Sequence, residues 1–76
     1  MAKFSGEKLR EILQERGMSQ AKLAREMKVN PRVVCRYCHG QRKPKIDTLM
    51  LMAQILRVPV SALVTFPRYE EGGDVR

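Results

Sequence analysis

Two short helical segments separated by only three residues constrain the fold of this chain more than any other feature. The first segment follows Ser19, a preferred N-cap residue, and has an apolar stripe about two turns long. The stripe consists of Ala21, Leu23, Ala24 and Met27. The second segment follows Asn30 and begins with Pro31, which suits a first helical position because its missing N–H would have no partner there. Residues 28–30 therefore form a tight turn between two helices.

The N-terminal segment predicts another helix by the same signals. Ser5 can cap it, and Leu9, Ile12 and Leu13 follow helical spacing. Gly17 stands where a left-handed residue at the helix end is favoured. We therefore expect a helix over residues 6–16.

Two more helices are predicted after the polar connection of residues 41–45. Ile46 and Asp47 are typical of a hydrophobic staple and a cap at a helix start. The core face of that helix is expected to contain Leu49, Met52, Ala53 and Leu56. A short fifth helix should begin near Pro59 and end near Val64.

The length of the chain and its pattern define the fold class. Seventy-six residues suffice for one small domain, and no alternating strand pattern of useful length occurs. We expect an all-α domain of five helices over residues 1–64, with a C-terminal tail over 65–76. A chain this short has no capacity for a large catalytic cleft, and its Ser and Asp residues are better explained as caps than as catalytic groups, so we do not expect an enzyme.

The positive charge of the chain is concentrated in its middle. The net charge is +7, and residues 31–45 hold five basic residues and no acidic one. Such a local excess suits a polyanion such as nucleic acid, although a solvated basic loop would have the same composition. The longest apolar run covers only residues 49–53, and the N-terminus lacks the apolar segment of a signal peptide, so a cytoplasmic location is expected.

The second helix of the pair carries arginines on the face that the core does not need. Val34 and Tyr37 should point inward, which leaves Arg32 and Arg36, four residues apart, on one outer face. A helix fits the major groove of DNA, and Arg can donate two hydrogen bonds to the O6 and N7 atoms of guanine. Val33 beside them could contact a thymine methyl group.

These residues together resemble the Cro and lambda-repressor-like, or XRE-type, helix-turn-helix family. The resemblance covers roughly residues 6–64, and cap, core and turn positions agree in order and spacing. It rests on Met18-Ser-Gln-Ala-Lys-Leu-Ala24, Val29-Asn30, Val34 to Gly40, Pro44-Lys-Ile-Asp-Thr-Leu49, Ala53, Leu56 and Val58. The resemblance implies a five-helix domain that binds operator DNA, usually as a dimer, and regulates transcription.

The resemblance and the chemistry of the side chains together assign roles to individual residues. Base reading is expected from Asn30, Arg32, Val33 and Arg36. Contacts with the DNA backbone are expected from Ser19, Gln20, Lys22, Gly40, Gln41, Arg42, Lys43 and Lys45. We expect a repressor bound to a near-palindromic operator.

Four positions depart from the family pattern, and the mildest change is Tyr37, where the family often has Trp or Ile. Lys28 and Arg57 stand where the family usually has Gly, and a left-handed residue other than Gly costs about 1 kcal/mol or somewhat more. Pro31 replaces a residue that is often polar and reads a base. This change places more of the specificity on Arg32 and Arg36.

The segment Cys35-Arg36-Tyr37-Cys38-His39 also matches C-x-x-C-H, the haem-attachment signature of c-type cytochromes. Haem attachment belongs to an export compartment, and the helical spacing already assigns part of the segment to a core. Two thiols and one imidazole could alternatively hold a metal, although the fourth ligand would have to be water or come from a partner chain. Redox control of DNA binding through the thiols of Cys35 and Cys38 is a further hypothesis. The simplest interpretation is two small side chains on a helix surface, with no metal and no cofactor.

Apolar residues on the fourth helix exceed the needs of one core face. Met50, Leu51 and Ile55 either widen the core or form a dimer surface. The tentative dimer surface consists of Leu51, Ile55, Val58, Val60 and Leu63. The alternative function is a protein-interaction module of the same fold, as in an antitoxin, but such a module would need a long partner-binding extension.

Overall fold

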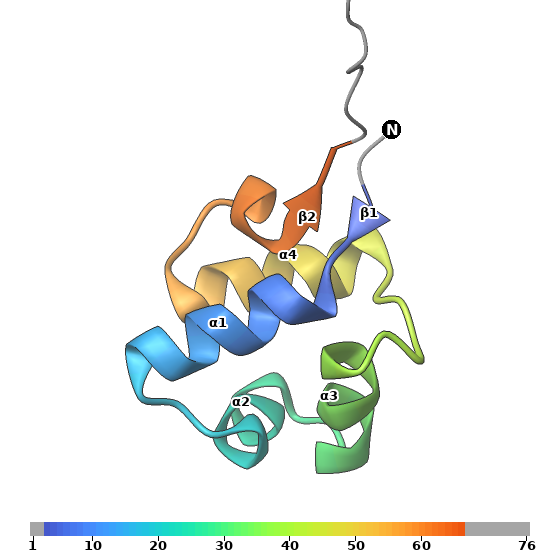
Figure 1. Ribbon diagram of the computed structural model, residues 1–76. Helices are drawn as coiled ribbons and strands as arrows, with labels where there is room; N and C mark the ends of the chain where they lie inside the picture. The colour runs from blue at the N-terminus through green and yellow to red at the C-terminus, as the bar shows by residue number, and fades with distance from the viewer. Residues whose placement is uncertain (1–2, 67–76) are drawn as a thin grey trace, which may run out of the picture.

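The computed structural model describes residues 3–66, which form four α-helices, one 3₁₀ helix and two short strands (Figure 1). In chain order they are β1 (Lys3–Phe4), α1 (Gly6–Arg16), α2 (Gln20–Met27), α3 (Pro31–Cys38), α4 (Ile46–Leu56), η1 (Val60–Leu63) and β2 (Val64–Thr65). The predicted all-α helix-turn-helix fold is confirmed. In this part of the chain, no helix combines the length and the apolar character needed to span a bilayer.

Side-chain caps begin the first three helices at the predicted residues. Each cap oxygen accepts a hydrogen bond from a backbone N–H of the first turn, which satisfies a donor that has no partner within the helix. The pairs are Lys8 N to Ser5 Oγ (3.2 Å), Lys22 N to Ser19 Oγ (3.0 Å) and Arg32 N to Asn30 Oδ1 (2.8 Å).

The predicted cap of α4 was wrong by two positions. Lys45 is the N-cap residue and makes no side-chain cap hydrogen bond, and Asp47 lies within the first turn. A carboxylate in the first turn still interacts favourably with the positive end of the helix dipole. The acidic residue therefore marks the helix start, although it does not cap it.

The C-terminal part of the fold differs from the prediction in two ways. The expected fifth helix is a single 3₁₀ segment of four residues, too short for regular α-helical hydrogen bonding. Strand β2 follows it directly and pairs antiparallel with β1, with Phe4 opposite Val64 and Lys3 opposite Thr65. Thr65 was assigned to the tail but is part of this ladder; residues 67–76 of the predicted tail lie outside the described residues.

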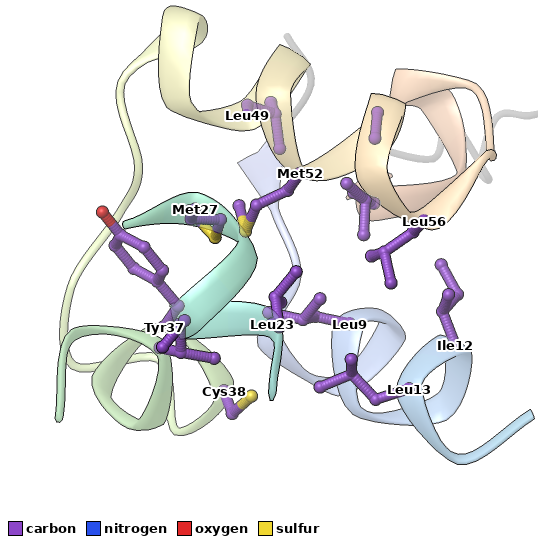
Figure 2. Close-up of a cluster of buried hydrophobic side chains, with 14 of the residues drawn as sticks. Leu9, Ile12, Leu13, Leu23, Met27, Tyr37, Cys38, Leu49, Met52 and Leu56 are labelled. Carbon is purple, nitrogen blue, oxygen red and sulfur yellow. The ribbon is translucent and has the colours of Figure 1, made fainter. Parts of the chain in front are cut away.

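One apolar cluster holds the helices together (Figure 2). Its fully buried large side chains come from every helix, and they are Leu9, Leu23, Val34, Cys38, Met52, Leu56 and Leu63. The α2–α3 pair lies at the opposite side of the molecule from the two strands, with α1 between them (Figure 1). The cluster thus fixes α3 from within while leaving its outer face open.

The two positions that lack the family glycine adopt the conformation that glycine favours. Lys28 has φ of 61° and Arg57 has φ of 59°, and both are C-cap residues in the left-handed region. Each turn closes with a hydrogen bond between the next backbone N–H and a helix carbonyl, from Val29 N to Ala24 O and from Val58 N to Ala53 O. The turns that end α2 and α4 therefore hold both residues in a backbone conformation that is strained for a residue other than glycine.

Candidate nucleic-acid interface

Helix α3 has one buried face and one exposed face. Val34, Tyr37 and Cys38 are at most 5% exposed and point into the core cluster. Arg32 and Arg36 are both exposed, and their spacing of four residues places them on the same side of the helix. Both arginines are therefore exposed on the side of α3 that the core does not cover.

The turn before α3 sets the orientation of that face. Met27 ends α2, Pro31 begins α3, and only residues 28–30 connect them. Within the described residues, α2 and α3 form the most extensive contact between any two elements. The two helices therefore pack as one unit, which fixes the backbone that presents the side chains of α3.

Helix α1 supports the C-terminal half of α3 from behind. Gly6 lies so close that a Cβ atom there would fall 2.6 Å from Cys38 O and would also overlap Tyr37 O. The guanidinium of Arg10 donates a hydrogen bond from Nη1 to Cys38 O. From β1, the ring of Phe4 packs edge-on against Tyr37, with centroids 6.2 Å apart.

These supporting contacts were missed by the sequence analysis. Gly6 was included only as the first residue of a predicted helix, and Arg10 and Phe4 had no assigned role. A glycine at a helix start carries no signal that another backbone passes over it. Their importance arises from which helix α1 packs against, and that is a property of the tertiary structure.

Two of the residues expected to read bases are partly engaged in the fold. Asn30 Oδ1 accepts the cap hydrogen bond from Arg32 N. Val33 is half-buried and packs against the core cluster. Arg32 and Arg36 therefore project more freely than their two neighbours.

The residues expected to contact phosphate lie on both sides of α3 in the chain. Ser19 and Lys22 are exposed and Gln20 is half-buried at the start of α2. After α3, Gly40 takes a left-handed φ of 72° and lets Gln41 N donate to Arg36 O at 2.9 Å. The exposed residues that follow are Gln41, Arg42, Lys43 and Lys45.

The two cysteines have different environments, so the expectation that both lie on a helix surface was wrong. Cys38 has no exposed area and belongs to the core (Figure 2), while Cys35 is exposed on the outer face. Burial raises the pKa of the Cys38 thiol, and the charge of Arg10 partly offsets this effect.

The burial of Cys38 also corrects two alternatives. A haem link through both cysteines would require the second thiol to leave the core. Among residues 3–66, no group of three or more His, Cys, Asp or Glu side chains is arranged to hold a metal ion. The three-ligand interpretation of the C-x-x-C-H segment therefore fails.

The tentative dimer surface is only partly exposed. Leu51 is 39% exposed, and Ile55, Val58 and Val60 are half-buried. Leu63 has no exposed area, so its assignment to a dimer surface was wrong. Its side chain fills the core beneath the 3₁₀ segment and cannot meet a partner without unfolding this region.

Comparison with known proteins agrees with this geometry. A family model described as helix-turn-helix matches residues 9–63. A search of the curated proteins gave no match.

Several solved structures share the fold. The restriction-modification controller protein C.AhdI from Aeromonas hydrophila is 28% identical, with a TM-score of 0.72 over 76% of this chain and 88% of that one. The biofilm master regulator SinR, solved in complex with DNA, is 24% identical, with a TM-score of 0.71 over 76% of this chain and 94% of that one. Apo-HppE is 23% identical, with a TM-score of 0.74 over 79% of this chain but only 34% of that one.

The family model covers most of the chain, and its match spans the capped α2–α3 pair described above. The chain therefore belongs to the XRE-type helix-turn-helix family of DNA-binding transcriptional regulators.

Proposed function

We propose that this protein is a repressor that binds a near-palindromic operator as a homodimer. The single observation that supports this most strongly is the pair of exposed arginines, Arg32 and Arg36, on the one face of α3 that the core leaves open. A helix is about 10–12 Å across and a major groove about 12 Å wide, so this face can enter the groove.

In this proposal, the two arginines discriminate bases and their neighbours adjust the fit. Each guanidinium can donate a bidentate pair of hydrogen bonds to guanine. Asn30 has its Oδ1 engaged in the cap, so its amide nitrogen is the atom left to donate to a base. Val33 offers its outward edge to a thymine methyl group.

Residues at the two ends of the α2–α3 unit hold the DNA backbone in this proposal. At the start of α2, Ser19, Gln20 and Lys22 bring side chains and a helix N-terminus to one phosphate strand. After α3, residues 40–45 supply Arg42, Lys43 and Lys45 to the flanking phosphates. Such contacts set the register of the protein on the duplex without reading sequence.

The dimer part of the proposal rests on the exposed apolar side chains of α4 and the segment after it. Leu51 is 39% exposed, the half-buried Ile55 lies four residues further along α4, and the half-buried Val58 follows the end of that helix. If two chains pair through this surface about a two-fold axis, the two α3 helices lie about 34 Å apart, one turn of DNA. The two-fold symmetry of such a pair makes the operator a near-palindrome, and the spacing sets the distance between its half-sites.

Selection of bound sequences from a random duplex pool tests the proposal. We expect a consensus with two inverted half-sites whose centres are separated by one helical turn, and each half-site should contain a guanine that depends on Arg32 or Arg36. Sedimentation of the protein, alone and on the selected duplex, should show a dimer on DNA. Recovery of no consensus, or a monomer bound to a single half-site, would contradict the proposal.

A further inference from the structure

A groove of about 440 Å³ opens beside the two short strands. It is bordered by β1, by the end of the connection before α4, by the start of α4, and by the segment from η1 through β2. In Figure 1 the strands and η1 lie on the opposite side of the molecule from the α2–α3 pair. The volume falls within the range of about 300–1,000 Å³ that is typical of small-molecule sites, and the groove is separate from the base-reading face of α3.

Apolar side chains form most of the lining of this groove. Leu49 and Val64 are buried, and Phe4 is half-buried. Ile46 and Phe66 are 63% and 62% exposed, and they are two of the four large apolar side chains that are exposed in the described part of the chain. Covering such side chains with an apolar ligand removes their surface from water, which favours binding.

The polar residues of the lining provide positive charge and no negative charge. They are Lys3, Lys43 and Ser61, all exposed, and no acidic residue among residues 3–66 lines the groove. A negatively charged group at the edge of the groove is attracted by both ammonium groups. The lining therefore favours a ligand with an apolar body and one anionic end.

The same lining disfavours two other occupants. A second copy of this chain has a net charge of +7 and, in a two-fold contact, would bring its own two lysines to this face, where like charges repel. A DNA phosphate would match the charge but would leave the apolar lining in water. Val60 of the tentative dimer surface lines the groove, whereas Leu51, Ile55 and Val58 do not, so a ligand here leaves most of that surface available.

We propose that this groove binds an amphipathic carboxylate with a medium-length aliphatic chain, and that the bound carboxylate weakens DNA binding by pairing with Lys43. The aliphatic chain packs against the apolar lining, and the carboxylate pairs with Lys3 and Lys43 at the edge of the groove. The second half of this inference rests on the proposed function, in which Lys43 contacts a phosphate.

The direction of the effect on DNA follows from the loss of one phosphate contact. A Lys43 ammonium that is paired with the ligand no longer neutralises a phosphate, so the slope of log affinity against log salt becomes shallower by about 0.9. Phosphate contacts carry no sequence information. The ligand should therefore weaken binding to operator and to random DNA by the same factor.

The binding half is tested without DNA by titrating the full isotope-labelled chain with butanoate, hexanoate and octanoate, followed by NMR of the backbone amides. We expect shifts at Phe4, Leu49 and Val64, and an affinity that rises up to about fourfold for each methylene that the groove buries. Octylamine, which has the same chain as octanoate but a positive end, should bind more weakly than octanoate. Shifts at α3 in place of the groove, equal affinity for butanoate and octanoate, or equal binding of octylamine would overturn the proposal.

Substitutions of the two lysines test the charged end of the site. Lys3→Met and Lys43→Met keep an apolar side chain of similar length, and each should lower octanoate affinity about two- to fivefold, as for exposed ion pairs. Lys22→Met is the matched control, because Lys22 lies on α2 outside the groove, and it should bind octanoate as the wild type does. Circular dichroism checks that each variant is folded. Wild-type affinity in a variant that carries both groove substitutions would overturn the proposal.

The regulatory half is tested by measuring affinity for the selected operator and for random duplex, in octanoate and in acetate at the same concentration. Acetate matches the ionic strength but has no aliphatic chain to fill the groove. We expect octanoate to weaken binding to both duplexes equally and to make the salt dependence shallower, and acetate to do neither. Equal effects of the two anions, or an unchanged salt slope in octanoate, would overturn this half. Failure to select any operator would count against the proposed function, while the titration without DNA would still decide the ligand site.

Discussion

The two faces of α3 differ in what their side chains do, although they share eight consecutive residues. Val34, Tyr37 and Cys38 are buried and determine where the helix lies. Arg32, Cys35 and Arg36 are exposed, and none of them is needed by the core. The two cysteines illustrate this difference, because Cys38 is buried in the core while Cys35, with the same side chain, is exposed. The phase of the helix, rather than residue type, decides the role.

The largest effect is expected from the buried face. Tyr37→Ala should lower the free energy of unfolding by about 3–5 kcal/mol, because it leaves a cavity next to Phe4 and removes an aromatic contact. Urea denaturation measures this loss. Because Tyr37 lies on the buried face of α3, the affinity for operator DNA should fall only to the extent that unfolded protein accumulates. A loss of affinity in fully folded Tyr37→Ala protein would mean that the buried face also takes part in DNA recognition.

The contact between α1 and the end of α3 comes next. Gly6→Ala places a Cβ atom against the carbonyl groups of residues 37 and 38, and overpacking of this kind costs about 1–3 kcal/mol of stability. The matched control is Gly17→Ala, where a Cβ atom meets nothing within 4 Å and only the left-handed backbone is strained. Gly17→Ala therefore measures the cost of a left-handed alanine without a steric overlap, and a Gly6→Ala variant that unfolds at the wild-type urea concentration would show that the close approach at Gly6 is not a constraint.

On the exposed face, the expected effect is on binding alone. Arg36→Ala should weaken operator binding by about 1–3 kcal/mol and relax specificity at one base pair, with stability unchanged. Lys43→Ala should weaken binding to operator and random DNA alike, because phosphate contacts carry no sequence information.

Arg57→Gly provides the control for loss of positive charge, since Arg57 follows α4 at the end opposite to the 40–45 connection. Equilibrium binding to matched and single-mismatch duplexes measures all three variants. Indistinguishable profiles for Arg36→Ala and Lys43→Ala would show that the role assignments are wrong.

A substitution in the turn before α3 should stabilise the fold. Lys28→Gly should raise the free energy of unfolding by about 1 kcal/mol, because glycine adopts the left-handed φ of 61° without the steric cost that a side chain adds. In a domain of this size, that gain corresponds to an increase of about 4–8 °C in Tm. Thermal unfolding measures it, and a decrease would mean that the Lys28 side chain makes a stabilising contact that outweighs the strain.

The smallest effect concerns pH. Burial raises the pKa of Cys38 in the folded state, so its stabilising contribution is complete below the pKa of an unfolded thiol, about 8.5, and is lost as the pH rises through the folded value. Unfolding measured from about pH 8 upward should therefore show a steeper decline in stability for Cys35→Ser, which keeps Cys38, than for Cys38→Ala. Parallel declines would contradict the assignment of the buried thiol.

The limits of prediction follow from the range over which each interaction acts. The caps at Ser5, Ser19 and Asn30 were predicted because cap and N–H are two or three residues apart in the chain. The pairing of β1 with β2 was not predicted, because strands of two residues are too short to show an alternating apolar pattern. Lys3 also lies opposite Thr65 only once the helices have packed. The burial of Cys38 and Leu63 was missed for a related reason, since an α3 or η1 residue becomes core only when another element covers it.

The sequence by itself determined the helices α1 to α3, their caps, the three-residue turn, and the sharing of one face by Arg32 and Arg36. These depend on hydrogen bonds and spacings within about four residues. Only the tertiary structure decided that Gly6 and Arg10 contact α3, and that one cysteine is enclosed while the other meets solvent beside His39. Those outcomes depend on which surfaces the packed helices bring into contact, and local spacing does not contain that information.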